Sequence, residues 1–356
     1  MGLSEHTMTL SIGQILKGSV ASYHVAHVLK APTVFQARVV PFENSNSNRP
    51  AQLAVLKHFP DGLNKIQYNR ELHNYTLDSI AQSPYIRSML DRIGHDETSA
   101  REGNIEPQCM VFEWMDTDLW QLPSAPFRSG SILPRTVAQS ILEALAVLDA
   151  EGGVHTDVNP NNVFLSGAEG PSPVVKLGDL GNLVPAGPMG KVRYQGVTIR
   201  APEVWMDVPI TPKADVWSLG VTLAHWLAGT TLFGPADKIV EDLTEHWCIA
   251  KLMRLVGPIG RPDASKTDII DEFALAEYFE SDTFVHPQTG MKERYIKVGT
   301  IRQELEKVPG PIDVECIDFI ESLLVPDPTR RPSAREALQH PWLTGASGYG
   351  SDWSVD

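Results

Sequence analysis

The chain of 356 residues contains little cysteine, and Cys109, Cys248 and Cys316 are widely spaced without a C-x-x-C pair. This spacing predicts neither a disulfide framework nor a zinc site, and it favours a reducing compartment. No apolar run is long enough to span a bilayer, so no membrane association is expected. The segment Met1–His6 lacks the charged and then apolar layout of a secretory signal. We therefore expect a protein of the cytoplasm, the nucleus or both.

Positive charge is also scarce. Lysine and arginine number 30 against 44 aspartates and glutamates, and the net charge is -14. Direct binding to nucleic acid is therefore not expected, whereas a basic protein substrate would suit the acidic surface. The hydrophobic fraction of 42% is ample for a core. The length suits one two-lobed domain or two small ones.

Two short motifs carry the chemistry. His155–Asn162 reads H-x-D with an asparagine five residues after Asp157, and Asp179 begins a D-x-G after the strand-like run Val174–Leu177. Together they supply a proton acceptor and two oxygen ligands for metal, which is the equipment for moving a phosphoryl group from magnesium ATP to a hydroxyl. Asp157 would accept or orient the hydroxyl proton. Asn162 and Asp179 would hold magnesium.

Further motifs follow in a fixed order along the chain. Lys57 ends the strand-like run Ala-Val-Leu-Lys, and Glu71 lies on a plausible helix that could bring its carboxylate to Lys57. Downstream stand Ala201-Pro202-Glu203, Asp215–Gly220, Asp327–Pro332 and His340–Trp342. This ordered series resembles the eukaryotic protein kinase family over nearly the whole chain.

The resemblance implies an α+β, two-lobed fold, with a small antiparallel β-rich N-lobe that contains one helix and a larger α-helical C-lobe. We expect a lead-in over residues 1–20, a kinase domain over 21–343 and a flexible tail over 344–356. Within the domain, the N-lobe would cover about 21–114 and the C-lobe about 115–343. A monomer is expected.

Local patterns predict several elements. Strands are expected over Tyr23–Leu29, Thr33–Val40 and Gln108–Trp114, with a polar turn at Glu43–Asn48. Apolar residues at helical spacing predict a helix before His155. Lys213–Gly229 reads as a buried helix that ends at its glycine, and residues 261–310 read as a mixed, acidic insert.

The resemblance also assigns the nucleotide site. Phe112 would guard the back of the adenine pocket, backbone groups of Glu113 and Met115 would bond the adenine, and Asp118 would bond the ribose. Lys57, held by Glu71, would orient the α- and β-phosphates. The residues implied for the walls of the adenine slot are Val55 and Phe164.

Other residues have structural roles by the same resemblance. Glu203 and Arg331 should form a partly buried pair, and Asp215 should hold the backbone of the catalytic loop. Arg200 is typical of the group that contains the cyclin-dependent, mitogen-activated and SR-protein kinases.

Within that group the sequence is most similar to the SR-protein kinases. Those kinases also have threonine in place of the arginine of H-R-D and leucine in place of the phenylalanine of D-F-G, and here these residues are Thr156 and Leu180. In many kinases that arginine is held by a phosphate on the activation segment, here Asp179–Glu203. Thr156 cannot make this contact. We therefore expect activity without phosphorylation of that segment.

The chain departs from the family at three places. The phosphate-covering stretch Leu29–Val34 contains no glycine, and Pro32 has no N–H to offer. Asn159 stands where the family has a lysine, and one lost electrostatic contact of this kind typically costs about 100- to 1000-fold in rate. The adenine slot is narrowed by Val55 and Phe164.

The interpretation is therefore a serine/threonine protein kinase that uses ATP and magnesium, similar to the SR-protein kinases, with basic or Arg/Ser-rich proteins as substrates by analogy. The alternative is a pseudokinase that acts as a scaffold and binds partners or nucleotide. A small-molecule phosphotransferase is disfavoured, because such enzymes generally lack the Ala-Pro-Glu and Asp327–Arg331 segments.

Overall fold

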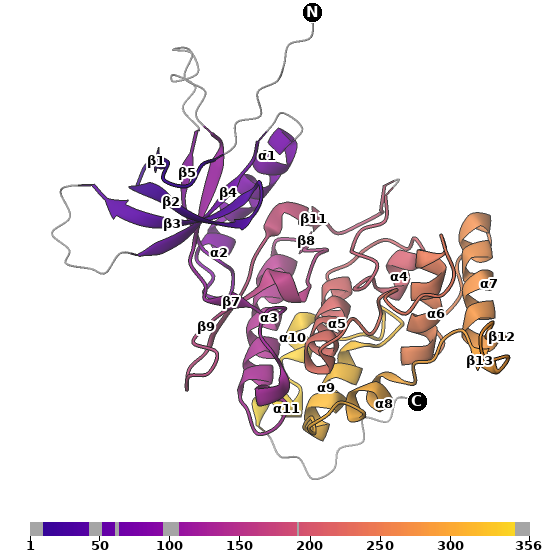
Figure 1. Cartoon of the computed structure of the whole chain (residues 1–356). Helices are drawn as coiled ribbons and strands as arrows, with labels where there is room; N and C mark the ends of the chain where they lie inside the picture. The colour runs from indigo at the N-terminus through magenta and orange to yellow at the C-terminus, as the bar shows by residue number, and fades with distance from the viewer. Residues whose placement is uncertain (1–9, 43–51, 61–63, 95–106, 191, 346–356) are drawn as a thin grey trace, which may run out of the picture. The chain divides into compact units, whose positions relative to one another are not determined.

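The computed structural model, whose elements are labelled in Figure 1, describes residues 10–42, 52–60, 64–94, 107–190 and 192–345. The chain forms two compact units. The N-terminal unit runs to Asp116 and includes Gly178–Gly181, and the C-terminal unit comprises Thr117–Leu177 and the chain from Asn182 onward. The predicted turn Glu43–Asn48 and residues 346–356 of the predicted tail lie outside the described residues.

The N-terminal unit is built on a sheet of six strands, in which every neighbouring pair is antiparallel. The spatial order is β1-β2-β3-β4-β6-β5. The strands are β1 (Ile15–Lys17), β2 (Ala21–Lys30), β3 (Val34–Pro41), β4 (Leu53–His58), β5 (Met89–Ile93) and β6 (Cys109–Glu113). The three strands predicted from sequence correspond to β2, β3 and β6.

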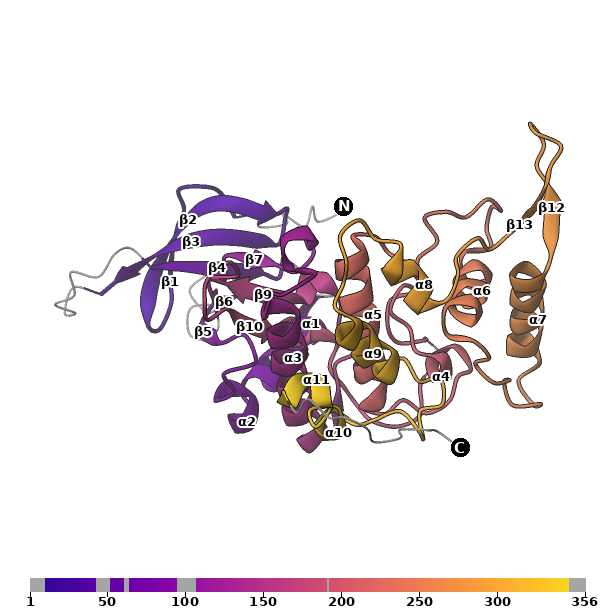
Figure 2. The ribbon, with the colours of Figure 1, turned by 90° about the horizontal axis from the view of Figure 1, so that it is seen from below.

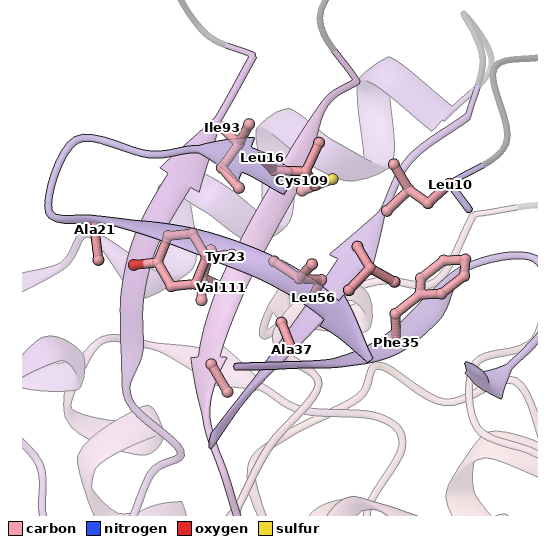
Figure 3. Close-up of a cluster of buried hydrophobic side chains, with 12 residues drawn as sticks. Leu10, Leu16, Ala21, Tyr23, Phe35, Ala37, Leu56, Ile93, Cys109 and Val111 are labelled. Carbon is pink, nitrogen blue, oxygen red and sulfur yellow. The ribbon is translucent and has the colours of Figure 1, made fainter. Parts of the chain in front are cut away.

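One face of this sheet carries a hydrophobic core (Figure 3). Its members are Leu10, Leu16, Ala21, Tyr23, Val25, Phe35, Ala37, Ala54, Leu56, Ile93, Cys109 and Val111. Along each strand they recur at every second position, because successive side chains of a strand point to opposite faces. Leu56 belongs to this core, so its neighbour Lys57 projects from the other face of β4.

The prediction of a loose lead-in over residues 1–20 is wrong for its described part. Ile15–Lys17 form the edge strand β1, in which Leu16 pairs with Tyr23 of β2. Leu10 and Leu16 are buried in the core. The segment is short and only Leu16 of β1 is buried, so alternation within it was too brief to reveal a strand.

Helix α1 (Asn64–Tyr75) lies beside the sheet in Figure 1, and the short helix α2 (Asp78–Ala81) follows it. Tyr68 of α1 packs edge-on against the ring of Phe59, just after β4, with ring centroids 5.1 Å apart. With α1 held in this way, the carboxylate of Glu71 points toward Lys57 of β4. The expected single helix of this unit is thus joined by one further turn of helix, α2.

The C-terminal unit is mainly helical. Its helices of four residues or more are α3 (Leu133–Ala150), α4 (Pro202–Trp205), α5 (Lys213–Ala228), α6 (Thr244–Val256), α7 (Thr267–Ser281), α8 (Ile301–Glu306), α9 (Val314–Leu323), α10 (Ala334–Ala337) and α11 (Pro341–Thr344). Its short strands are β7 (Thr117–Asp118), β8 (Gly153–Val154), β9 (Val163–Ser166), β10 (Val174–Leu177), β11 (Val184–Pro185), β12 (Thr283–Val285) and β13 (Lys292–Arg294).

Helix α5 is the central element of this unit and packs against α3, α8 and α9. Almost every residue of α5 is buried, as its continuous apolar sequence predicts. Gly229 ends the helix in the left-handed conformation with φ 68°, and its N–H donates to the carbonyl of Trp226 at 3.1 Å. The predicted helix and its glycine end are confirmed.

The segment predicted as a mixed insert contains α7, the β12–β13 hairpin and α8. Helix α7 packs against α6, and Arg254 of α6 pairs with Glu280 of α7 at 2.9 Å. In Figure 2 the hairpin extends past the end of α7. The insert is therefore ordered by one helix pair and one strand pair.

The predicted α+β fold, with an antiparallel sheet in the N-terminal unit and helices dominating the C-terminal unit, is confirmed. Among the described residues, no helix combines the length and apolarity that crossing a bilayer requires.

Candidate active site

The N-terminal unit brings three predicted site residues into direct contact. Lys57 Nζ on β4 lies 2.9 and 2.7 Å from the two carboxylate oxygens of Glu71 on α1. The same ammonium lies 2.9 Å from Oδ1 of Asp179. One cation thus links a strand, a helix and the D-x-G motif, which lies far away in the sequence.

Burial differs sharply among these three groups. The side chain of Glu71 is 2% exposed, that of Lys57 24% and that of Asp179 40%. Burial raises the pKa of Glu71 to about 7, with Lys57 opposing the shift and Asp179 adding to it. Burial favours the neutral form of Lys57, but the negative charges of Glu71 and Asp179 outweigh this effect and raise the pKa of Lys57. The ammonium therefore stays charged at neutral pH beside an accessible carboxylate.

The position of Asp179 is set by the backbone of the D-x-G motif and by a hydrogen bond from α1 to that backbone. Asp179 adopts a left-handed conformation with φ 59°. Asn74 of α1 donates its side-chain amide to the carbonyl of Leu180 at 2.8 Å. A Cβ on Gly181 would lie only 3.0 Å from Oε2 of Glu71 and 3.2 Å from Oδ1 of Asp179. A side chain at this position would therefore require both carboxylates to move by a few tenths of an ångström.

The catalytic loop of the C-terminal unit is anchored on α5. The carboxylate of Asp215 accepts the N–H groups of His155 at 2.6 Å and Thr156 at 2.9 Å. Burial raises the pKa of Asp215 to about 6, although His155 and these two bonds oppose the shift. Thr222, two turns along α5, donates its hydroxyl to the carbonyl of Val158 at 3.0 Å. These contacts match the architectural role predicted for Asp215.

Two amide groups fix the carboxylate of Asp157. Asn159 donates to Oδ1 at 2.8 Å, and Asn162 donates to Oδ2 at 3.0 Å. Both amides also bond the carbonyl of Asp157, at 3.1 and 2.8 Å. Oδ1 of Asn159 accepts the N–H of Asn161 at 2.9 Å, which holds this amide in turn. The residue in place of the family lysine therefore orients Asp157 through a neutral hydrogen bond.

The donor set fits magnesium. Asn162 donates through its amide nitrogen, so its amide oxygen is the atom that would face a metal ion, and Asp179 offers a carboxylate. In the described part of the chain, no cluster of three or more histidine, cysteine or acidic side chains could form a metal cage. Magnesium in phosphoryl-transfer sites typically takes one or two protein oxygens together with phosphate and water. The amide oxygen of Asn162, in the C-terminal unit, and the carboxylate of Asp179, in the N-terminal unit, are groups of this kind, and both residues remain predicted ligands.

The residues predicted around the adenine lie in two groups. In the N-terminal unit, Val55 pairs with Phe112 across β4 and β6, and both are buried, as is Met115. In the C-terminal unit, Asp118 pairs with Phe164 across β7 and β9.

Two residues predicted to contact the nucleotide, Asp118 and Glu113, have hydrogen-bond partners that the sequence did not predict. The two carboxylate oxygens of Asp118 accept the N–H and the side-chain amide of Gln121, at 2.9 and 2.6 Å. Arg87 donates to the carbonyl of Glu113. No motif marks Arg87, because it is the only charged residue of Tyr85–Met89 and its partner is a backbone atom of β6.

The glycine-free stretch forms a tight turn between β2 and β3. The carbonyl of Lys30 accepts the N–H of Thr33 at 2.9 Å, and the carbonyl of Thr33 accepts the N–H of His58 at 2.7 Å. The backbone N–H of Thr33 is thus already bonded, and Pro32 has none. This turn offers fewer backbone donors to a phosphate than a glycine-rich loop would.

The activation segment is held by ion pairs of Arg193 and by a hydrogen bond from Thr156. Arg193 forms two parallel bonds with Glu272 of α7, at 2.9 and 2.5 Å, and lies 3.2 Å from Glu245 of α6. The hydroxyl of Thr156 donates to the carbonyl of Asn182 at 2.9 Å. Thr156 therefore reaches the start of the segment directly, at the position where the family usually has an arginine.

Comparison with known proteins gives a consistent result. The chain is 28% identical over 255 residues to human Dual specificity tyrosine-phosphorylation-regulated kinase 3, covering 66% of this chain and 41% of that protein. It is 28% identical over 243 residues to Cyclin-dependent kinase F-4 of Oryza sativa subsp. japonica, covering 67% and 46%. It is 26% identical over 266 residues to Dual specificity protein kinase YAK1 of Saccharomyces cerevisiae, covering 66% and 32%.

The aligned region therefore spans less than half the length of these relatives. The family model described as Protein kinase domain matches residues 82–343. The matched span contains Asp157, Asn162 and Asp179 and begins after Lys57 and Glu71. Because the match covers most of the sequence, this chain belongs to the protein kinase domain family.

Proposed function

We propose that this chain transfers the γ-phosphate of ATP to serine and threonine hydroxyls of proteins, in the manner of the SR-protein kinases. The observation that carries the proposal is the intact contact of Lys57 with Glu71 and Asp179. A degraded kinase would have little use for a buried glutamate whose carboxylate is held by a lysine. Membership of the kinase family supports the same reaction.

Each charged group has a defined task in this proposal. Lys57 neutralises phosphate charge, and Glu71 fixes its position. Asn162 and Asp179 would hold magnesium, which would supply further neutralisation of that charge when bound. Asp157 orients the substrate hydroxyl, whose oxygen bonds to the γ-phosphorus as the bond to ADP breaks, and it accepts the hydroxyl proton. Asn159 keeps the carboxylate of Asp157 in position.

We also propose that activity needs no phosphate on the activation segment. The paired bonds from Arg193 to Glu272 do for this segment what a phosphate contact does in many kinases. The bond from Thr156 to Asn182 adds a second attachment. Treatment with a phosphatase should therefore leave the rate unchanged.

For the protein substrate, we propose a basic or Arg/Ser-rich sequence. The net charge of -14 favours it, and the C-terminal unit carries a pocket of about 460 Å³ whose lining includes Asp268, Asp271 and Glu272. Asp268 and Asp271 are exposed. Arginine side chains would pair with them.

A pseudokinase is the second candidate, and two observations favour it. The Lys30–Thr33 turn offers few donors to phosphate, and Asn159 supplies a neutral group where the family has a cation. Under this alternative the chain would bind partners or nucleotide without transfer.

Radiolabelled transfer from magnesium ATP to a panel of basic and Arg/Ser-rich proteins separates the two candidates. We expect labelling by the wild type and none by Asp157→Asn, which keeps the shape of the side chain. Phosphoamino-acid analysis should find phosphoserine and phosphothreonine. The names of two relatives include dual specificity, so phosphotyrosine would extend the acceptor class. Nucleotide binding without any transfer by the folded wild type would establish the pseudokinase.

A further inference from the structure

Arg87 lies two residues before the start of β5 and is 8% exposed. Its Nε and Nη2 atoms both donate to the carbonyl oxygen of Glu113, at 3.1 and 2.8 Å. The rest of Glu113 is fixed by Ser88, whose N–H donates to the glutamate side chain at 2.7 Å and whose carbonyl accepts the N–H of Glu113 at 3.0 Å. The orientation of this carbonyl is therefore set by Arg87 and Ser88 together.

The guanidinium also lies over the ring of Phe112, 5.7 Å from its centroid. The ring of Tyr75 meets Phe112 edge-on, with centroids 4.9 Å apart. Burial lowers the pKa of Arg87, with Tyr75 and Glu113 opposing the shift, but arginine remains charged in proteins. A fixed positive charge thus stands beside both the carbonyl of Glu113 and the side chain of Phe112.

This charge changes what the carbonyl can recognise. A carbonyl oxygen has two lone pairs, and here two N–H groups of one guanidinium already point at it. A third hydrogen, such as one from the exocyclic amine of adenine, would find a crowded and partly neutralised acceptor. The keto oxygen at the same place on guanine is normally repelled by a free carbonyl. Arg87 weakens that repulsion.

We propose that Arg87 determines base selectivity, so that the nucleotide site binds magnesium GTP about as well as magnesium ATP. This inference rests on the proposed function and on the expectation, implied by the kinase resemblance, that backbone groups of Glu113 and Met115 bond the base. It adds the substrate class at that site, a purine nucleoside triphosphate rather than ATP alone.

The test is the dissociation constant of each magnesium nucleotide, measured by titration calorimetry on the full chain. For the wild type we expect ATP and GTP to bind within about threefold of each other. Arg87→Leu removes both donors and should raise the preference for ATP by about fivefold, the factor that one neutral hydrogen bond supplies. Arg92→Leu, at an exposed arginine on the following strand β5, is the matched control and should leave the ratio unchanged.

Arg87→Met fills the same space, and it replaces Arg87→Leu if the latter fails to fold. A tenfold or greater preference of the wild type for ATP would overturn the inference and leave the proposed kinase intact. A ratio that Arg87→Leu and Arg87→Met both leave unchanged would do the same. If the folded wild type binds neither nucleotide, the proposed function fails and the inference fails with it.

Discussion

The carboxylate of Glu203 receives two parallel bonds from the guanidinium of Arg331, at 2.7 and 2.8 Å, and both side chains are almost completely buried. Arg331 also donates to the carbonyls of Val325 and Lys213, at 2.9 and 3.0 Å, and lies over the ring of Trp217. The pair predicted from sequence therefore ties the Ala-Pro-Glu segment to the end of the domain. Every polar atom of the guanidinium has a partner.

Breaking this pair should destabilise the protein strongly. Glu203→Gln leaves the charge of Arg331 buried without a counter-ion, which typically costs roughly 3–5 kcal/mol. Urea unfolding measures this loss. The exposed neighbour change Arg330→Met should alter the free energy of unfolding by less than about 0.5 kcal/mol. The double variant Glu203→Leu with Arg331→Met should recover at least half of the loss, and a single variant as stable as the wild type would refute this role.

Stability should fall with acid through His225. Burial, assisted by Lys251, lowers the pKa of His225 from 6.5 to about 3, and its Nε2 accepts the N–H of Phe233 at 3.2 Å. The neutral form is therefore favoured in the folded state, so its stabilisation is complete above pH 6.5 and is lost as the pH falls toward 3.

Between pH 7 and pH 5 this linkage removes roughly 2 kcal/mol of unfolding free energy. The raised pKa values of Glu71 and Asp215 act in the opposite direction. His225→Gln removes only the histidine contribution, so the difference between variant and wild type isolates it. If urea unfolding gives the two proteins the same pH dependence, His225 does not titrate in this way.

Asn159 should limit the rate of transfer. Asn159→Lys restores a cation beside Asp157 and should raise kcat by about tenfold, a part of the 100- to 1000-fold that such a contact contributes. Asn159→Ala removes the bond to Asp157 Oδ1 and should lower kcat by about tenfold. Initial rates, with thermal melting as the check on folding, measure both. Equal rates for the two variants would show that neither charge nor position at residue 159 matters.

The pocket whose lining includes Asp268, Asp271 and Glu272 should govern recognition of basic substrates. Asp268→Asn with Asp271→Asn removes two exposed charges and should raise KM for an Arg/Ser-rich protein about threefold at low salt, with kcat unchanged. Glu306→Gln with Glu315→Gln removes the same charge from other exposed positions and serves as the control. An equal rise in KM for the control would assign the effect to net charge rather than to this pocket.

Sequence predicted most reliably what is encoded in a few adjacent residues. Lys57 and Asp179 were recognised from short motifs, and their contact with each other is a property of the fold. The end of α5 was visible because Gly229 favours the left-handed conformation. The edge strand β1 was missed because only Leu16 of its residues is buried, and a strand of that length has almost no pattern.

The parts of the site that escaped prediction depend on distant partners. Arg87 acts on a carbonyl 26 positions away, and no rule of spacing connects them. Asn159 was recognised as a missing lysine that could still donate a neutral hydrogen bond, but the acceptor of that bond, Asp157, depends on the turn that follows. The sequence therefore identified residues with the right chemistry, but it did not predict which partners their side chains would bond.

The contact of Lys57 with Glu71 and Asp179 should be the place where a magnesium nucleotide binds. The most direct measurement is the affinity of the wild type and Asp179→Ala for ATP, with magnesium and with EDTA. We predict that magnesium strengthens binding to the wild type at least tenfold and that Asp179→Ala abolishes this gain while remaining folded. An affinity that depends on magnesium equally in both proteins would contradict the account.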